Sequence, residues 1–161
     1  VNPAAFTAVD RAEHERDAAW CVNARAPEIL AAEARRAGAV FVHYSTDYVF
    51  GGEPGRPWRE GDAPAPLNAY GESKLAGERA VAASGARHVI LRTSWVYGAR
   101  GRNFLATVLD RARAMTELRV VNDQRGAPTP ARLLAAVTAA LLRHPRVAGA
   151  GEADAVWGVY H

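Results

Sequence analysis

Two residues four positions apart, Tyr70 and Lys74, have types and a spacing that could do chemistry together. On a helix, this spacing places both side chains on one face, one turn apart. A tyrosine phenol has an ordinary pKa of about 10 and is a slow acid near neutral pH. A lysine ammonium nearby favours the phenolate, so we expect Lys74 to lower the pKa of Tyr70 and make it a useful proton donor.

The composition singles out the same lysine. The chain of 161 residues contains nineteen arginines and one lysine, which is Lys74. An ammonium is a compact point charge and a guanidinium is a wide planar fork, so the two are not interchangeable in a site. The alternative is that Tyr70 and Lys74 only form a solvated helix face, because such a pair arises easily by chance among five tyrosines.

Length and composition favour a single domain, since 161 residues with 49% hydrophobic side chains can bury one core. The net charge is +3, and acidic residues are interspersed throughout without a basic run, so we expect no nucleic-acid or membrane partner. The single cysteine, Cys21, rules out an internal disulfide and is expected to be buried. No membrane-spanning run or signal peptide is visible, so we expect a cytoplasmic location.

Helical and extended patterns alternate along the chain. A helical pattern covers residues 10–36, where Pro27 predicts a kink or a junction of two helices and Gly38 a C-terminal stop. The short apolar run at 39–44 is typical of a strand buried on both faces. We also expect helices at 69–83, 103–115 and 130–143, strands at 89–93, 118–121 and 156–161, and loops at 51–66 and 145–151. This alternation predicts βαβ units and a mostly parallel sheet.

Ligands of such sheets bind beyond the carboxyl ends of the strands. Ser45 and Thr46 directly follow the buried run at 39–44, and a hydroxyl there can hydrogen-bond a substrate carbonyl while Tyr70 supplies a proton. Reduction of a carbonyl also needs a hydride, which protein side chains cannot provide, so a nicotinamide cofactor is implied. The alternative is that Ser45 and Thr46 only cap the end of the strand.

Several motifs, in this order along the chain, resemble the extended short-chain dehydrogenase/reductases and, within them, the dTDP-4-dehydrorhamnose reductases. They are NPAAFT (2–7), VHYSTDYVF (42–50), PLNAYGESKLAGE (66–78), RTSWVY (92–97), NF (103–104) and NDQRGAPT (122–129). The resemblance implies a Rossmann-like, doubly wound α/β fold with a mostly parallel sheet, present here as its C-terminal part with a small substrate-binding portion. We expect one partial domain over 1–161, in which 1–98 hold the rest of the dinucleotide-binding sheet with the catalytic motifs and 99–161 mainly bind substrate.

The resemblance also implies a reaction. NADPH or NADH would reduce the 4-keto group of a dTDP-4-dehydro-6-deoxy sugar, turning dTDP-4-dehydrorhamnose into dTDP-L-rhamnose. Tyr70 would donate the proton, Lys74 would hold the nicotinamide ribose, and Thr46 would orient the carbonyl. Cofactor contacts are expected from Ala4, Ala5, Thr7, Ser45, Tyr70 and Lys74, and substrate contacts from Thr46, Thr93, Trp95, Asn103 and Gln124. No metal ligands are predicted, and a homodimer is expected.

Some alternatives stay open at this point. Trp95 could be ordinary core packing, and residues 124–129 could be only a proline turn. Both strand-like ends, 1–5 and 156–161, look cut, and the sequence lacks the glycine-rich phosphate loop of the family, so we expect an internal part of a longer protein that is inactive alone. The choice between NAD and NADP cannot be read without that loop. The rival functions are another nucleotide-sugar reductase or epimerase of the extended family, and a non-catalytic, reductase-like regulatory subunit.

Overall fold

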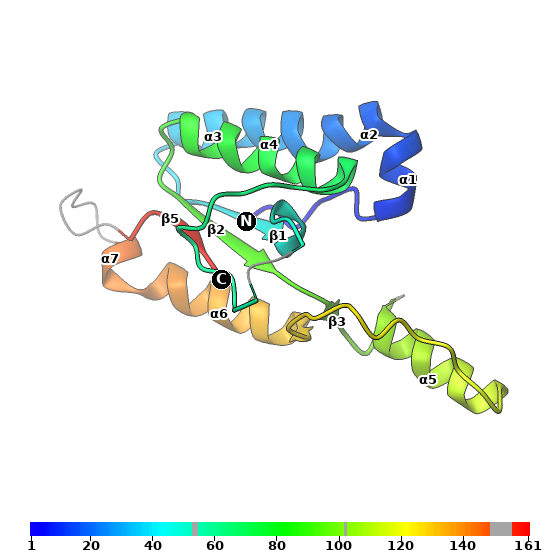
Figure 1. The fold of residues 1–161 in the computed structure, drawn as a ribbon. Coiled ribbons are helices and arrows are strands. Elements are labelled where there is room, and N and C mark those ends of the chain that lie inside the picture. Colours follow the sequence, from blue (N-terminus) through cyan, green and yellow to red (C-terminus); the bar gives the residue numbers. More distant parts are fainter. Residues whose placement is uncertain (53–54, 102, 149–155) are drawn as a thin grey trace. The chain divides into compact units, whose positions relative to one another are not determined.

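The structure, a computed structural model, describes residues 1–52, 55–101, 103–148 and 156–161. The chain forms two compact units (Figure 1). The first unit comprises Val1–Arg92 and Pro145–His161, and the second comprises Thr93–His144. None of the helices that the structure describes is both long and apolar enough to cross a membrane.

A three-stranded sheet in the order β1-β2-β5 forms the centre of the first unit. Its strands are β1 (Phe41–Thr46), β2 (His88–Thr93) and β5 (Gly158–Tyr160). β2 and β5 pair in parallel, with Val89 opposite Gly158. Asn2 adds an isolated parallel bridge to His43 of β1. The expected strand at the C-terminal end is therefore confirmed, and the N-terminal residues reach the sheet through the bridge at Asn2.

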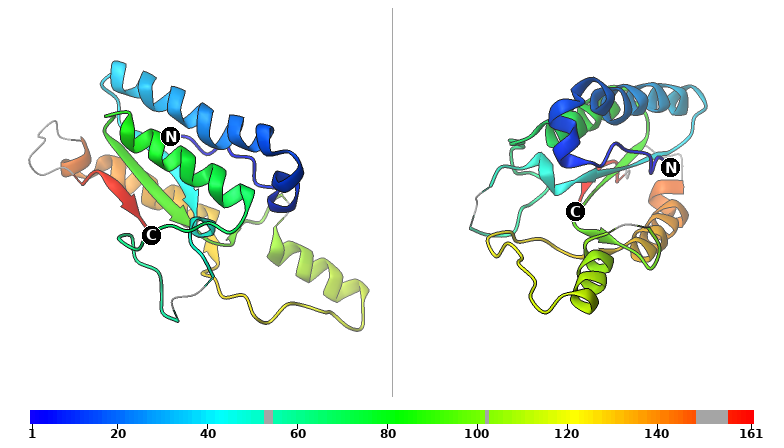
Figure 2. Two further views of the ribbon diagram at one scale, coloured as in Figure 1. Left: turned by 45° about the horizontal axis from the view of Figure 1, so that its top comes forward. Right: turned by 90° about the vertical axis from the view of Figure 1, so that its right-hand side faces the viewer.

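The helices α1 to α4 lie along one face of this sheet, with α3 and α4 (Ala69–Ala83) side by side (Figures 1 and 2). The predicted helical stretch at 10–36 is a series of pieces: α1 (Val9–His14), α2 (Arg16–Trp20), a π-helical turn (Cys21–Arg25) and α3 (Ala26–Arg36). Pro27 is the second residue of α3, where the π-helical turn changes to an α-helix, so the predicted junction is confirmed. Gly38 follows the helix with a φ of 63°, as a helix stop requires.

The core between helices and sheet uses small side chains on the helices and larger ones on the strands. One cluster joins Ala31 of α3 and Val81 of α4 to Phe41 of β1 and Ile90 of β2, all at most 5% exposed. Small side chains let the helices approach the sheet closely. Cys21 is exposed, so the expectation of a buried cysteine is wrong, because the inner side of this stretch is taken by Ala19, Asn23 and Pro27.

The helix α4 (Ala69–Ala83) packs against the π-helical turn at Gly77. A Cβ at this position would collide with the backbone carbonyl oxygen of Asn23. Because backbone cannot be displaced as easily as the end of a flexible side chain, Gly77 is required for this close approach.

Gly77→Ala is therefore expected to lower the free energy of unfolding by about 1–3 kcal/mol, because α4 must move away from the π-helical turn. Urea denaturation followed by circular dichroism measures the change. Gly61→Ala is the matched control, since no atom lies within 4 Å of the added methyl group. Equal stability of the two variants would contradict the close packing at Gly77.

The second unit contains α5 (Phe104–Ala114), α6 (Ala131–Arg143) and two short strands that pair in parallel, β3 (Val96–Tyr97) and β4 (Thr129–Pro130). Both predicted helices are confirmed, and the Asn103 side chain caps α5 by accepting from Ala106 N at 2.9 Å. The strand expected at 118–121 is wrong. Val120 and Val121 are 55% and 65% exposed, and this described segment has no strand beside it to supply backbone partners.

The loop predicted at 145–151 is also partly wrong. Pro145–Ala148 forms the short helix α7, which begins at a proline as helices readily do. Residues 149–151 lie outside the described residues, as do residues 53–54 of the predicted loop at 51–66. The assignment of cofactor binding to 1–98 and of substrate binding to 99–161 stays a prediction.

Candidate functional site

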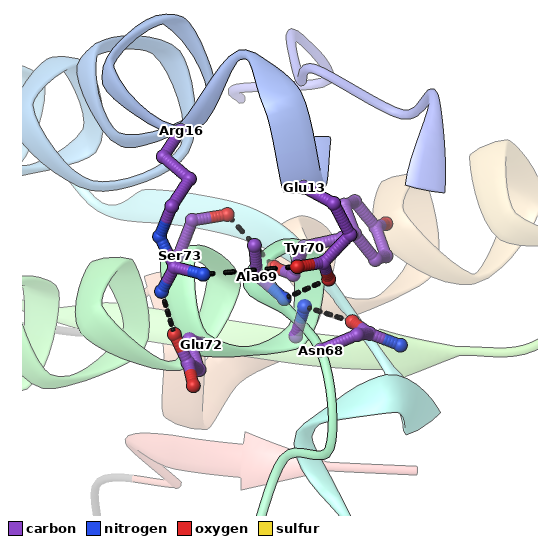
Figure 3. Close-up of polar contacts among 8 residues, drawn as sticks. Glu13, Arg16, Asn68, Ala69, Tyr70, Glu72 and Ser73 are labelled. Carbon is purple, nitrogen blue, oxygen red and sulfur yellow. Dashed lines mark hydrogen bonds and ion pairs between the residues drawn. The ribbon is translucent and has the colours of Figure 1, made fainter. Parts of the chain in front are cut away.

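The first turn of α4 is held in place by side chains that satisfy its free backbone N–H groups (Figure 3). Asn68 Oδ1 accepts from Gly71 N at 2.8 Å, and Glu13 Oε1 accepts from Ala69 N at 2.7 Å. The first N–H groups of a helix have no partner within the helix, so these two caps stabilise its start. Tyr70, the second residue of α4, is thereby given a fixed position.

Close packing of α4 on the turn after β1 brings Tyr70 beside that turn. The turn is the short 3-10 helix η2 (Asp47–Val49), and a Cβ at Gly71 would collide with the carbonyl oxygen of Tyr48. The rings of Tyr48 and Tyr70 meet edge to face, with centroids 5.6 Å apart. Gly71 is therefore required for the packing that places Tyr70, the candidate proton donor, beside this turn.

Tyr70 is 9% exposed, and burial raises the pKa of its phenol above the ordinary value. A hydrogen bond with the Thr46 side chain lowers this pKa, and the nearby Asp47 and Tyr48 raise it, with burial the largest cause. The net shift of the Tyr70 pKa is therefore opposite to the lowering expected from Lys74, because desolvation of the phenolate is its largest cause. Tyr70 therefore carries its proton at neutral pH, and burial makes it a weaker acid than a free phenol.

Lys74 is only 2% exposed, so the alternative of a solvated helix face is wrong. Its Nζ donates to the backbone oxygen of Tyr44 at 2.7 Å and lies 3.5 Å from Nε2 of His43. Burial lowers the pKa of Lys74 to about 8, against the opposing effect of the Glu78 carboxylate. The amine can therefore change its protonation state within an ordinary range of pH.

An ion pair that the sequence analysis did not identify lies one turn beyond Lys74. The Glu78 carboxylate accepts from Arg92 Nε at 2.9 Å and from Nη2 at 2.7 Å, and both side chains are 5% exposed. The guanidinium also lies 4.9 Å from the ring centre of Phe50. Glu78 lies four residues after Lys74 in the sequence, and this helical spacing could have predicted an electrostatic interaction between the two side chains.

Asn23 was missed as well, and it joins the expected cofactor segment to α4. Its side chain accepts from Phe6 N at 2.8 Å and donates to Phe6 O at 3.0 Å and to Ser73 Oγ at 3.0 Å. Ser73 Oγ in turn donates to the backbone oxygen of Tyr70 at 2.7 Å. The available sequence signal is an asparagine among apolar residues of a helical pattern. In the structure Asn23 is fully buried, and buried polar groups need partners.

His43 is the third missed residue, a fully buried histidine in the strand beside Lys74. Its Nδ1 lies 3.2 Å from Nδ2 of Asn2, and its ring stacks on Phe41 with centroids 6.2 Å apart. Burial, and then the charge of Lys74, lower the pKa of His43 to about 3. The available sequence signal for His43 is an ionisable residue within the apolar run at 39–44, which was expected to be buried on both faces.

Because of His43, the free energy of unfolding is expected to decrease as the pH is lowered. Its folded pKa of about 3 lies below the ordinary 6.5, so the unfolded chain binds the proton first. The contribution is complete above pH 6.5 and is lost progressively as the pH falls toward 3. Urea denaturation between pH 7 and pH 4 should show up to about 1.4 kcal/mol lost per pH unit from this residue.

The control for this pH dependence is His43→Asn, which lacks the titrating ring and should show a shallower dependence over the same range. Lys74 titrates at about 8, above this range, and groups distant from His43 contribute in the same way to both proteins, so the difference in slope isolates His43. An identical slope in the two proteins would contradict a buried, neutral His43.

The expected cofactor residues of the first unit lie around these groups. Ser45 and Thr46 are the last residues of β1 and are at most 5% exposed. Thr46 Oγ1 accepts from Tyr48 N at 3.2 Å, so it caps η2 in addition to its hydrogen bond with Tyr70. Ala4 and Thr7 are exposed and Ala5 is half-buried, in the segment that Asn2 and Asn23 hold.

Trp95, in the second unit, has an unusual backbone. Its φ is 46°, the left-handed region that a bulky side chain rarely adopts, and strain of this kind is concentrated at functional sites. The side chain is 39% exposed, so the alternative of ordinary core packing is wrong. Its ring lies against Phe104, with centroids 5.9 Å apart, and leaves no room for a Cβ at Gly126.

Apart from Thr46, which lies in the first unit, the other expected substrate residues lie in the same unit as Trp95. Gln124 is exposed in the loop that ends at β4, and Thr129 N donates to Trp95 O at 3.3 Å, which ties this loop to Trp95. Thr93 is half-buried at the end of β2. The amide of Asn103 caps α5 and donates to Gly98 O at 2.9 Å, so it has a structural role. Contact of any of these residues with a substrate stays a prediction.

Comparison with known proteins identifies relatives over the whole chain. The family described as the RmlD substrate binding domain matches residues 1–161. The dTDP-4-dehydrorhamnose reductase of Escherichia coli (strain K12) is 54% identical over 153 residues, which are 92% of this chain and 51% of that protein. The dTDP-4-dehydrorhamnose reductase of Burkholderia thailandensis is 51% identical over 164 residues, which cover 100% of this chain and 54% of that protein.

A solved structure agrees with these sequences. The dTDP-4-dehydrorhamnose reductase of Bacillus anthracis in complex with NADP superposes with a TM-score of 0.88 and 38% identity, over 99% of this chain and 53% of that one. The expected Rossmann-like α/β fold with a parallel sheet is thereby confirmed. The chain spans about half the length of the curated relatives it matches.

Proposed function

Because this chain belongs to the family of RmlD substrate binding domains, we propose that it carries the catalytic residues of a reductase for dTDP-4-dehydro-6-deoxy sugars, which converts dTDP-4-dehydrorhamnose to dTDP-L-rhamnose. The observation that carries the proposal is the buried group of Thr46, Tyr70 and Lys74. All three residues are at most 9% exposed, Tyr70 packs edge to face on Tyr48 of the turn that Thr46 caps, and Lys74 lies one helical turn farther along α4.

The proposed role of Tyr70 is to donate its phenolic proton to the oxygen of the 4-keto group. The Thr46 hydroxyl donates to Asp47 Oδ1 at 3.2 Å, and it would turn from this partner to donate to the same keto oxygen. The position of Thr46 at the end of β1 is fixed by the turn that follows. The phenolate left on Tyr70 is then stabilised by the positive charge of Lys74. The raised pKa of the phenol favours the protonated form before the reaction.

The cofactor we propose is NADPH or NADH, which supplies the hydride when it is bound. The donors present suit its ribose: the Lys74 ammonium has three N–H groups, and its two polar neighbours, Tyr44 O and His43, leave it able to donate to a ribose hydroxyl. Ala4, Ala5, Thr7 and Ser45 are the further residues proposed to line the nicotinamide. The Bacillus anthracis relative, solved with NADP, supports this choice.

The proposed substrate contacts are Thr93, Trp95, Asn103 and Gln124. The strained backbone and the exposure of Trp95 support its role, because an exposed tryptophan held at an unfavourable φ suggests a ring positioned to contact a ligand. The homodimer and the cytoplasmic location stay predictions.

The test is turnover by the intact protein. We expect NADPH oxidation with dTDP-4-dehydro-6-deoxy sugars, with dTDP-L-rhamnose as the product, and little or none with the corresponding UDP sugars. Turnover with a UDP sugar alone would support another nucleotide-sugar enzyme of the extended family. Binding of the sugar nucleotide with no turnover would support the regulatory subunit.

A further inference from the structure

A chain of polar contacts leads to the side of Lys74 that faces β1. Ala4 N donates to Asn2 Oδ1 at 3.2 Å, Asn2 Nδ2 lies 3.2 Å from His43 Nδ1, and His43 Nε2 lies 3.5 Å from Lys74 Nζ. Asn2, His43 and Lys74 are at most 5% exposed. Neither Asn2 nor His43 belongs to the group proposed to contact substrate or cofactor.

The direction of these hydrogen bonds follows from the first of them, in which the backbone N–H of Ala4 is the donor. A backbone N–H can only donate, so the Asn2 atom that meets Ala4 N is the oxygen, and the atom that meets His43 is the amide nitrogen. Because an amide nitrogen also only donates, His43 Nδ1 is the acceptor. A neutral imidazole with an accepting Nδ1 carries its proton on Nε2, the nitrogen that faces Lys74.

We propose that His43, oriented by Asn2, is a positioning residue for Lys74: its Nε2–H lies against the Lys74 amine and directs the N–H groups of that amine away from β1. This inference rests on the proposed function, because those N–H groups are then available to Tyr44 O and to a ribose hydroxyl. Two N–H groups cannot form a hydrogen bond with one another, so an ammonium that rotated toward His43 would lose a partner.

The same contact favours the neutral amine, whose lone pair can accept from His43 Nε2–H. The described ionisable groups around Lys74 are His43 from β1, Tyr70 and Glu78 from α4, Asp47 from η2 through Tyr70, and Arg92 from β2 through Glu78. Glu78 acts in the opposite direction, since its carboxylate raises the pKa of Lys74. We therefore expect His43 and Glu78 to set the protonation of Lys74 from opposite sides.

The direct test is the tautomer of His43 in the intact wild-type protein. Its ring nitrogens are observed by ¹⁵N NMR after labelling with ring-labelled histidine, and His43→Asn assigns the signals. We expect the proton on Nε2 and a neutral ring at pH 7. A proton on Nδ1 overturns the proposal, because His43 would then accept from Lys74 instead of facing it with a donor.

A second test measures Lys74 itself, by ¹³C NMR of the lysine Cε with Lys74→Arg as the assignment variant. His43→Asn keeps a polar group toward Asn2 and removes the one toward Lys74, so we expect the midpoint of the Lys74 titration to rise by about half a pH unit or more. His88→Asn, the same substitution on β2, is the control and should leave the midpoint unchanged. An unchanged midpoint in folded His43→Asn also overturns the proposal.

Neither NMR measurement uses turnover, so failure of this inference can be told apart from failure of the proposed function. With turnover, His43→Asn should move the alkaline limb of the kcat/KM profile upward with the Lys74 midpoint and leave KM for the sugar nucleotide within about twofold. If His43→Asn does not fold, the tautomer in the wild-type protein still decides.

Discussion

Tyr70→Phe is expected to lower kcat of the intact protein by roughly 10²–10⁴-fold, the usual contribution of a positioned general acid. The substitution removes only the phenolic oxygen. The ring of Tyr70, which is 9% exposed and lies edge to face with Tyr48, keeps its packing. The affinity for sugar nucleotide should stay within about twofold, since the lost interaction matters mainly in the transition state.

The matched control is Tyr160→Phe. Tyr160 also has a hydrogen-bonded hydroxyl, which donates to Val156 O at 2.8 Å, but it lies in β5 outside the proposed catalytic group. It should cost about 1 kcal/mol of stability and leave kcat near the wild-type value. Turnover by Tyr70→Phe close to that of Tyr160→Phe would remove Tyr70 from its proposed role.

Glu78→Gln is expected to lower the free energy of unfolding by about 3–5 kcal/mol, because it leaves the buried Arg92 charge without its partner. It should also lower the pKa of Lys74 further, since the Glu78 carboxylate is the group that raises it. Urea denaturation measures the first effect, and NMR titration of Lys74 measures the second.

Two controls separate these effects from a general loss of charge. Glu28→Gln breaks an exposed pair with Arg25, whose side chains are 49% and 66% exposed, and should cost less than about 1 kcal/mol. Glu78→Leu combined with Arg92→Met removes both buried charges and should recover much of the lost stability. If Glu78→Gln were as stable as Glu28→Gln, the ion pair would not contribute as the geometry indicates.

Local signals predicted the helix that carries the candidate site. The bounds of α4, Ala69–Ala83, agree with the predicted 69–83, because Asn68 supplies a cap and the apolar pattern continues without a break. Pro27 and Gly38 gave equally reliable signals for the ends of α3. The strand expected at 118–121 failed because a run of valines needs a partner strand, and partners are set by contacts distant in sequence.

The site was predictable only in part, for the same reason. The spacing of Tyr70 and Lys74 places them on one helix face, but it does not show what surrounds them. Asn2 reaches His43 across 41 positions, and His43 reaches Lys74 across 31. The pKa of Tyr70 is raised where a lowering was expected, because burial, a property of the folded chain, is the largest cause of the shift.

Transfer of deuterium tests the central claim most directly. The intact protein is given dTDP-4-dehydrorhamnose and NADPH that carries deuterium at the transferable position of C4, and the product is analysed by NMR and mass spectrometry. A reductase that uses Tyr70 as its proton donor predicts one deuterium on C4 of dTDP-L-rhamnose, one oxidised cofactor for each product, and loss of this transfer in Tyr70→Phe. A product without deuterium, or cofactor that stays reduced while the sugar changes, would contradict the reductase and indicate an epimerase or a binding protein.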